Sequence, residues 1–268
     1  MIRHVAIEKL WGQYELDWHL HPDVNILAGV NGSGKSTLLR ILDTALSGGN
    51  NLSLRLPHLR ALRITGEQIE INLHPEESGY WKNECGCDFI GTFDEITYEK
   101  KALSRELSPL AAYLDAITFD TQRPSLNNYR LKATENPAAG HRISDRLQQW
   151  IEIVNAFFSI TQKTFVIQGS DVFFKQANGE KLALHLLSAG EKQLLIILTN
   201  ALTQDEKPFI LLMDEPEISL DIDWQYQLVD TIRKINPSCQ LIIATHSPAI
   251  FGDGWNNKLF FMDELLKK

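Results

Sequence analysis

Cysteine is scarce in this chain, and its scarcity excludes a disulfide-stapled protein. The 268 residues include three cysteines, Cys85, Cys87 and Cys239, an odd number with no repeating spacing. A lone C-x-C without a second pair of ligands also falls short of the roughly four ligands of a structural zinc site. We therefore interpret the cysteines as structural or incidental, with a metal or redox role for Cys85 and Cys87 as the alternative.

Long hydrophobic runs and excess basic charge are also missing. No apolar run approaches the roughly 18 residues that span a membrane, and the first residues lack the apolar stretch of a signal peptide. We therefore expect a cytoplasmic protein that does not enter a membrane. The net charge of −8 does not indicate a nucleic-acid binder, although a local patch of Arg55, Arg60 and Arg63 stays open.

The periodicity of apolar residues predicts strands that alternate with helices, most clearly in the second half of the chain. Such alternation favours an α/β fold with a largely parallel sheet. The expected strands are 2–9, 13–20, 24–28, a hairpin at 64–71, 89–98, 116–120, 172–175, 181–185, 209–213, 240–244 and 258–262. The expected helices are 38–45, a helix capped by Ser144 and Asp145 that runs to 158, 189–202 and 221–235.

A glycine-rich loop follows the strand at 24–28. Residues 29–36, GVNGSGKS, match the pattern G-x-x-x-x-G-K-[ST], in which backbone N–H groups curl around phosphates at a helix N-terminus. Lys35 would reach the β- and γ-phosphates, and the Ser36 hydroxyl would bind Mg²⁺. The loop therefore predicts ATP and Mg²⁺ as cofactors, because a plain glycine turn rarely satisfies the whole pattern. The residues predicted to bind the nucleotide here are Asn31, Gly32, Ser33, Gly34, Lys35, Ser36 and Thr37.

An apolar strand at residues 209–213, FILLM, is followed by Asp214 and Glu215. The carboxyl end of such a buried strand meets ligands at the edge of a parallel sheet. Asp214 is predicted to bind Mg²⁺, and Glu215 to orient or deprotonate the attacking water. An acidic pair after a strand is common by itself, and the glycine-rich loop earlier in the chain favours the catalytic interpretation.

Three further motifs make the sequence resemble the ABC ATPase superfamily. Residues 187–193, LSAGEKQ, resemble its signature loop, residues 219–221, SLD, its D-loop, and residues 245–247, THS, its switch histidine. The order of the motifs is similar over nearly all of residues 1–262. The continuations EKQ after the signature glycine and PEISL after Glu215 are similar to the soluble RecF, SMC and OLD-like ATPases, not to transporter subunits.

Two positions depart from that resemblance, since Ala189 replaces a usual glycine and Asp221 stands where many OLD-like proteins carry histidine. Neither an SMC-like coiled coil nor an OLD-type nuclease domain is expected. The resemblance implies a mixed or parallel P-loop core sheet, an antiparallel β lobe and a helical signature lobe in a single ATPase domain. Residues 1–50 and 204–268 would form the core, 51–141 a family-specific insertion with β-hairpins and the Q-loop, and 142–203 the signature lobe.

The resemblance also implies an ATP site shared by two copies of the chain. One copy would supply catalytic Lys35, Glu215 and His246, together with the Mg²⁺ ligands Ser36, Asp214 and Gln122. The other copy would contact the nucleotide through Ser188 and Gly190, and Asp221 of the D-loop is also a predicted nucleotide contact. Gln122 stands for the Q-loop glutamine, with an ordinary polar loop residue as the alternative. Trp11 and Tyr14 could stack on adenine, although packing is the more ordinary role for both.

The function that the resemblance implies is an ATP-hydrolysing switch that forms a homodimer or higher homo-oligomer around ATP and controls a separate effector protein. Compact ATPases with these motifs resemble subunits of bacterial anti-phage systems. One candidate is the ATPase subunit of PARIS-type systems, which works with a TOPRIM-like nuclease encoded nearby. The alternative is a RecF-like DNA-binding or repair ATPase, which a basic groove and DNA-stimulated turnover would distinguish.

Overall fold

The chain forms two compact units in a computed structural model that describes residues 1–48, 59–74, 79–91, 108–120, 124–135, 137–252 and 254–268. Unit 1 comprises Met1–Gly91, Pro208–Pro216 and Ser238–Lys268, and unit 2 comprises Thr92–Lys207 and Glu217–Pro237. The sequence-based division placed residues 217–237 in the nucleotide-binding core, whereas their contacts place them in unit 2. The reason is the apolar face of their helix, where Trp224 packs against Phe157 and Phe158.

A five-stranded parallel sheet in unit 1 has the strand order β13-β3-β12-β11-β7. Every residue of β11 and β12 is buried, as expected for strands covered on both faces. Because all five strands run the same way, their carboxyl ends meet at one edge. The strands are β3 (Val24–Ala28), β7 (Gly86–Ile90), β11 (Phe209–Asp214), β12 (Cys239–Ala244) and β13 (Leu259–Phe261).

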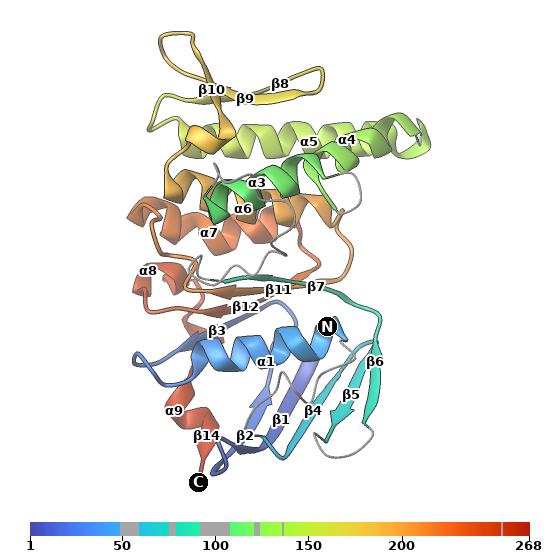
Figure 1. The fold of residues 1–268 in the computed structure, drawn as a ribbon, viewed down its shortest axis with the longest axis vertical. Coiled ribbons are helices and arrows are strands. Elements are labelled where there is room, and N and C mark those ends of the chain that lie inside the picture. Colours follow the sequence, from blue (N-terminus) through green and yellow to red (C-terminus); the bar gives the residue numbers. More distant parts are fainter. Residues whose placement is uncertain (49–58, 75–78, 92–107, 121–123, 136, 253) are drawn as a thin grey trace. The chain divides into compact units, whose positions relative to one another are not determined.

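An antiparallel sheet completes unit 1, with the order β14-β2-β1-β4-β5-β6. Helix α1 (Lys35–Ser47) lies between the two sheets (Figure 1), and its buried Leu38, Leu42 and Ala45 belong to the core that both sheets share. The strands are β1 (Ile2–Leu10), β2 (Tyr14–His19), β4 (Ala61–Gly66), β5 (Ile69–Leu73), β6 (Tyr80–Asn83) and β14 (Leu266–Lys267), and the short helices of this unit are α8 (Pro248–Phe251), η3 (Asn256–Lys258) and α9 (Met262–Leu265).

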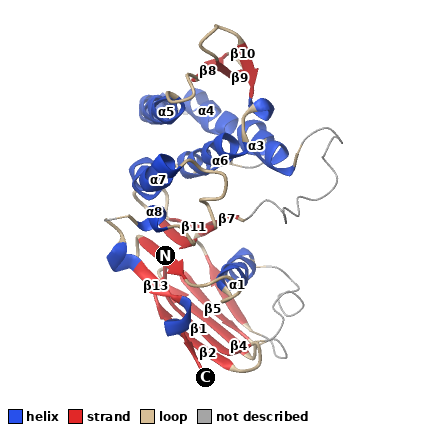
Figure 2. Cartoon of the chain, turned by 90° about the vertical axis from the view of Figure 1, so that its left-hand side faces the viewer, coloured by secondary structure: helices blue, strands red, loops and turns tan. Residues whose placement is uncertain are grey.

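Unit 2 is helical and carries a small three-stranded antiparallel sheet (Figure 2). Aromatic side chains fill its core, with the Phe158 and Phe174 rings stacked at 4.4 Å between centroids. The buried Trp150 donates its indole N–H to the Leu198 carbonyl at 2.9 Å. The elements are α3 (Pro109–Phe119), α4 (Leu126–Glu135), α5 (Pro137–Phe158), β8 (Thr164–Gln168), β9 (Asp171–Lys175), β10 (Lys181–Ala183), η2 (Leu184–Leu186), α6 (Ala189–Thr203) and α7 (Ile222–Ile235).

Three sequence predictions about secondary structure differ from the structure. Residues 184–185, predicted as strand, belong to η2. Residues 116–120, predicted as a strand, belong to the end of α3 and its C-cap, because the Ser108 hydroxyl caps this helix and Pro109 occupies its first turn. The helix predicted to begin at Ser144 begins at Pro137. Strand β8 was not predicted. Residues 92–107, which include most of the strand expected over 89–98, lie outside the described residues, and so does Gln122.

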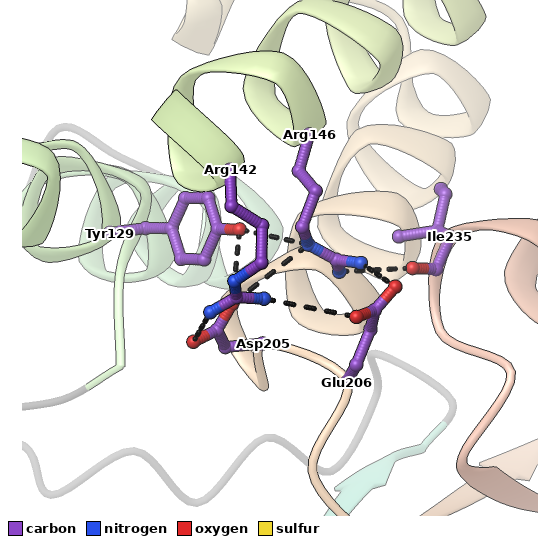
Figure 3. A network of polar contacts seen from close by, with 6 residues as sticks. All are labelled: Tyr129, Arg142, Arg146, Asp205, Glu206 and Ile235. Carbon is purple, nitrogen blue, oxygen red and sulfur yellow. Dashed lines mark hydrogen bonds and ion pairs between the residues drawn. The ribbon is translucent and has the colours of Figure 1, made fainter. Parts of the chain in front are cut away.

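The turn that leaves α6 is held by a network of six residues in unit 2 (Figure 3). Asp205 and Glu206 both adopt left-handed backbone, with φ of 55° and 58°, which is unfavourable for side chains with a Cβ. Arg146, 11% exposed, forms an ion pair with Glu206 and donates to the Tyr129 hydroxyl at 3.0 Å. These contacts fix the turn directly before β11. The network consists of Tyr129, Arg142, Arg146, Asp205, Glu206 and Ile235.

The described cysteine thiols lie in a buried environment. Cys85 and Cys239 are buried, and burial raises the pKa of Cys85 and, more strongly, that of Cys87. This environment disfavours the thiolate that redox or metal chemistry needs. Within the described ranges, no helix combines the length and apolar character required for a membrane span.

Candidate functional site

Three predicted motifs follow three neighbouring strands of the parallel sheet. The glycine-rich loop follows β3, Asp214 and Glu215 come at the end of β11, and His246 comes just after β12. Strand β12 lies between the other two, and all three are parallel. The topology therefore brings the motifs together at the carboxyl edge, where ligands of open α/β sheets bind.

A pocket of about 430 Å³ lies at this edge of unit 1. Six of its lining residues come from the glycine-rich loop and the start of α1, and two come from the ends of β11 and β12. Trp11, from the turn between β1 and β2, closes one side. The lining residues are Trp11, Asn31, Gly32, Gly34, Lys35, Ser36, Thr37, Glu215 and His246.

The loop backbone has the shape that phosphate binding requires. Gly34 caps α1 with left-handed backbone, φ 98°, and a Cβ there would come within 2.1 Å of the Trp11 ring. A side chain at this position would therefore strain the backbone and displace the Trp11 ring. The first N–H groups of an α-helix have no partner inside the helix and carry its positive dipole end, so the start of α1 favours an anion in the pocket.

Lys35 and Ser36, the first residues of α1, have polar partners in this pocket. Lys35 is 4% exposed, and its Nζ donates to the Gly29 and Val30 carbonyls at 3.0 and 3.1 Å. The Ser36 hydroxyl donates to Asp214 Oδ1 at 3.1 Å, and Asp214 is 2% exposed. A hydroxyl and a carboxylate side by side are hard oxygen ligands of the kind that Mg²⁺ binds, so these residues fit that ion.

Glu215 and His246 face each other across the pocket. His246 Nε2 lies 3.5 Å from Glu215 Oε1, and both side chains are partly exposed. Glu215 has left-handed backbone with φ 48°, held by its N–H bond to the Ala244 carbonyl at 2.8 Å. Such strain in a residue other than glycine is concentrated at functional sites, because the surrounding structure must maintain it. The arrangement can position a water beside a carboxylate base.

The signature residues, which belong to unit 2, form a capping box at the start of α6. Glu191 donates its N–H to the Ser188 hydroxyl at 3.3 Å, and the Ser188 N–H donates to Glu191 Oε2 at 2.9 Å. Glu191 is 3% exposed, and its other oxygen accepts from Lys163 at 2.5 Å and from Thr161 at 3.1 Å. Burial alone would raise the pKa of Glu191, but the bonds from Lys163, Ser188 and Thr161 hold that pKa below its usual value. Lys163 and Thr161 thus fix Glu191, which in turn fixes Ser188.

We expect Lys163→Met to destabilise the protein by about 3 kcal/mol, because it leaves the buried Glu191 carboxylate without its cation. The folded-state pKa of Glu191 is depressed, so its stabilising effect is present above its unfolded pKa and is lost as pH falls through the folded pKa. The wild type should therefore lose more stability between about pH 5 and pH 3 than Lys163→Met does.

Urea unfolding at several pH values measures both effects. Lys175→Met, which changes an exposed lysine on β9, is the matched control and should leave stability nearly unchanged. Equal stability of Lys163→Met and the control at neutral pH would contradict the assigned role of Lys163.

Gly190 is in contact with the D-loop inside unit 2. A Cβ at Gly190 would come within 2.0 Å of the Ser219 carbonyl oxygen, and Ser219 has left-handed backbone with φ 67°. The hydrogen bond from Asp223 N–H to the Asp221 side chain, 3.0 Å, then caps α7. The signature glycine therefore fits the D-loop backbone directly, with no room for a side chain.

Gly190→Ala should cost about 1–3 kcal/mol, because the new methyl group must displace the Ser219 backbone. Ala189→Gly, one residue earlier and exposed, is the matched control and should cost no more than about 1 kcal/mol. Thermal unfolding measures the difference between the two variants. If they are equally stable, the close approach of Gly190 and Ser219 is not a constraint on this position.

The structure places the predicted site residues in two groups. In unit 1, eight of them line the pocket, and Asp214 joins them through Ser36. Ser33 lies in the same loop, with its N–H bonded to Val30 O at 3.2 Å. Ser188, Gly190 and Asp221 belong to unit 2.

Sequence reasoning left the role of Trp11 open and missed two other residues. Trp11, for which stacking on adenine and ordinary packing were both considered, lines the pocket, with Tyr14 edge-on to its ring at 6.1 Å between centroids. Lys163 and Thr161 were not considered. The spacing of Ser188 and Glu191 is a capping-box signature that could have pointed to a supported Glu191.

Comparison with protein families gives one match over most of the chain. The family model AAA_21, described as "AAA domain, putative AbiEii toxin, Type IV TA system", matches residues 81–252. Septu protein PtuA of Bacillus thuringiensis is 21% identical over 296 residues, which cover 92% of this chain and 72% of PtuA. Retron Ec83 probable ATPase of Escherichia coli is 24% identical over 269 residues, covering 82% of this chain. The chain spans about half of that relative, 49% of its length.

Solved structures with a similar fold are SMC heads. An SMC head bound to the C-terminal winged-helix domain of ScpA has a TM-score of 0.64 at 15% identity, covering 93% of this chain and 90% of that one. The SMC head domain from Thermotoga maritima has a TM-score of 0.52 at 15% identity, with the same coverage. These likenesses confirm the predicted α/β fold.

Proposed function

Because the chain belongs to the AAA_21 family of P-loop ATPases, we propose that it binds ATP with Mg²⁺ in the unit 1 pocket and hydrolyses it to drive a molecular switch. The observation that carries this proposal is the meeting of four groups in one pocket. Lys35, the Ser36–Asp214 pair, Glu215 and His246 lie at the carboxyl edge of a single parallel sheet. That is the set of groups that phosphoryl transfer to water requires.

Each side chain has a distinct role in the proposed reaction. Lys35 exchanges its carbonyl partners for phosphate oxygens and offsets their negative charge. Ser36 and Asp214 would hold Mg²⁺, which neutralises phosphate charge when bound. Glu215 accepts a proton from the attacking water, and His246, 3.5 Å away, orients that carboxylate beside the γ-phosphate. Trp11 covers the phosphate loop and limits access of bulk water to the pocket.

A second copy of the chain completes the site in this proposal. Ser188 is exposed at the N-terminus of α6, where the helix dipole favours an anion, and its supports Glu191 and Lys163 hold it in place. A γ-phosphate bound by one copy is therefore a suitable ligand for the signature loop of another. Gly190 would pass the resulting displacement to the D-loop through Ser219. ATP would thus close a homodimer, and hydrolysis would open it.

The switch would act on a separate effector protein in anti-phage defence. This role is supported by the similarity of the chain to Septu protein PtuA and to a retron ATPase. The sequence motifs had suggested another system of this kind, the PARIS type. In this proposal, ATP hydrolysis ends in a change of assembly. Such a change alters the contacts that the protein makes with other proteins, which fits control of an effector.

The test is a pull-down with tagged protein from cells that also express the neighbouring genes, with ATP or ADP present. The proposal expects an effector that is captured in the ATP state and lost in the Lys35→Ala variant. Capture of the effector that does not depend on the nucleotide would contradict the proposed switch. ATP turnover that rises on addition of duplex DNA, with no protein partner captured, would favour the RecF-like alternative.

A further inference from the structure

A cluster of possible metal ligands lies on the antiparallel sheet of unit 1, outside the nucleotide pocket. His4 in β1 is directly opposite His19 in β2 in the strand register, and Asp17 precedes His19 by two positions. Side chains two residues apart on a strand share a face, and directly paired residues lie on the same face. The register therefore places two imidazoles and one carboxylate side by side (Figure 1 shows β1 and β2).

The ligand atoms of these three side chains converge. They all lie within 4.8 Å of one another, and within the described ranges this is the one such group of three or more His, Cys, Asp or Glu side chains. Asp17 Oδ1 lies 2.6 Å from His4 Nε2 and 3.6 Å from His19 Nε2. Metal–ligand bonds of about 2.0–2.2 Å in a tetrahedral zinc site separate neighbouring ligand atoms by about 3.3 Å. The distance from Asp17 Oδ1 to His19 Nε2, 3.6 Å, is already close to that spacing.

We propose that His4, Asp17 and His19 form a binding site for a divalent transition-metal cation of the Zn²⁺ type. Two imidazoles and a carboxylate suit Zn²⁺, Cu²⁺ or Ni²⁺, whereas Mg²⁺ and Ca²⁺ prefer oxygen ligands throughout. The side chains are 27%, 57% and 79% exposed for His4, Asp17 and His19, so water can reach the remaining coordination position. None of the three residues lines the nucleotide pocket.

Basic side chains on the neighbouring strands oppose a cation at this cluster. Arg63 in β4 is opposite Ala6 in β1, which is itself opposite Asp17 in β2, so Arg63 lies on the same face as the cluster. Lys267 in β14, next to β2 in the sheet, also acts on Asp17 and opposes a second positive charge. Removing Lys267 should therefore strengthen metal binding, which an ordinary His–Asp ion pair does not predict.

Metal bound here would tie β1 to β2. A ligand that binds the folded state alone stabilises that state by mass action. Both strands lie in the sheet that shares its core with α1, the helix that begins in the phosphate-binding loop. The expected effect is a higher unfolding temperature of unit 1, with ATP affinity unchanged.

The test is calorimetric titration of chelator-treated protein with ZnCl₂, without nucleotide and in excess Mg²⁺ so that the Ser36–Asp214 pair is occupied. The wild type should bind one Zn²⁺ per chain. His19→Ala and Asp17→Asn should each weaken binding by roughly tenfold or more, the cost that even outer-shell changes reach. Lys267→Ala should tighten it. His185→Ala, an exposed histidine in unit 2, is the matched control and should bind Zn²⁺ like the wild type.

Thermal unfolding with and without ZnCl₂ gives an independent readout. The unfolding temperature should rise with zinc in the wild type and in His185→Ala, and not in His19→Ala. His19 is mostly exposed, so its replacement leaves the fold intact, and unchanged ADP affinity verifies this. Zinc binding of equal affinity in His19→Ala and Asp17→Asn, or no saturable binding in the wild type, overturns the proposal.

Discussion

Glu215→Gln should hydrolyse ATP roughly 10²–10⁴-fold more slowly than the wild type, the usual contribution of a positioned acid–base group. Glutamine keeps the size and hydrogen-bonding reach of the side chain but cannot accept a proton from water. Lys35, Ser36 and Asp214 are unchanged, so ATP should still bind. The measurement is phosphate release under saturating ATP, together with ATP affinity by calorimetry.

The same variant should accumulate the ATP-bound assembly. If ATP joins the pocket of one copy to Ser188 of another, slow hydrolysis leaves that connection in place. Ser188→Arg in the Glu215→Gln background should undo the accumulation, because a bulky side chain occupies the place of the phosphate. Light scattering after size exclusion, with ATP and Mg²⁺, measures the mass of the single and double variants.

Two comparisons make this experiment decisive. Glu264→Gln changes an exposed glutamate in α9 of the same unit and should hydrolyse ATP at the wild-type rate. Wild-type turnover by Glu215→Gln would show that another group is the base. Slow turnover with no ATP-dependent change in mass would leave the Glu215 assignment intact and refute the two-copy site.

The sequence was most informative where chemistry restricts residue types over a short span. Residues 24–36 and 209–215 each combine a strand with a ligand-binding end, so type, order and spacing agree, and the structure brings them to one sheet edge. The apolar run at 116–120 has no such restriction. It was interpreted as a strand because its helix begins earlier, at Ser108 and Pro109, where the capping residues were not recognised.

Other features depend on tertiary contacts that no local pattern carries. His4 and His19 are isolated histidines along the chain, and their partnership exists only because the strand register sets them opposite each other. Lys163 is separated from Glu191 by the strands β8, β9 and β10, yet their contact holds the signature loop. Trp11 reaches the phosphate loop because the tight turn after β1, with Trp11 at φ 52°, directs it there.

Lys35→Ala should lower ATP affinity roughly 10²-fold, the effect of losing about 3 kcal/mol of charge-assisted hydrogen bonding to phosphate. Lys35 Nζ donates to the Gly29 and Val30 carbonyls of the glycine-rich loop. The Lys35 ammonium therefore lies within the loop that is proposed to bind the phosphates. Its loss removes a positive charge that the loop carbonyls cannot replace.

The fold should survive this change, because the core face of α1 is made by Leu38, Leu42 and Ala45 and not by Lys35. Lys9→Ala, which removes an exposed lysine paired with Glu15 at 3.2 Å, is the control and should bind ATP like the wild type. Calorimetry with ATP and Mg²⁺ measures both affinities, and thermal unfolding without nucleotide verifies the fold. If Lys35→Ala is folded and binds ATP as tightly as Lys9→Ala, the phosphates lie elsewhere and the pocket at the carboxyl edge of the parallel sheet is not the nucleotide site.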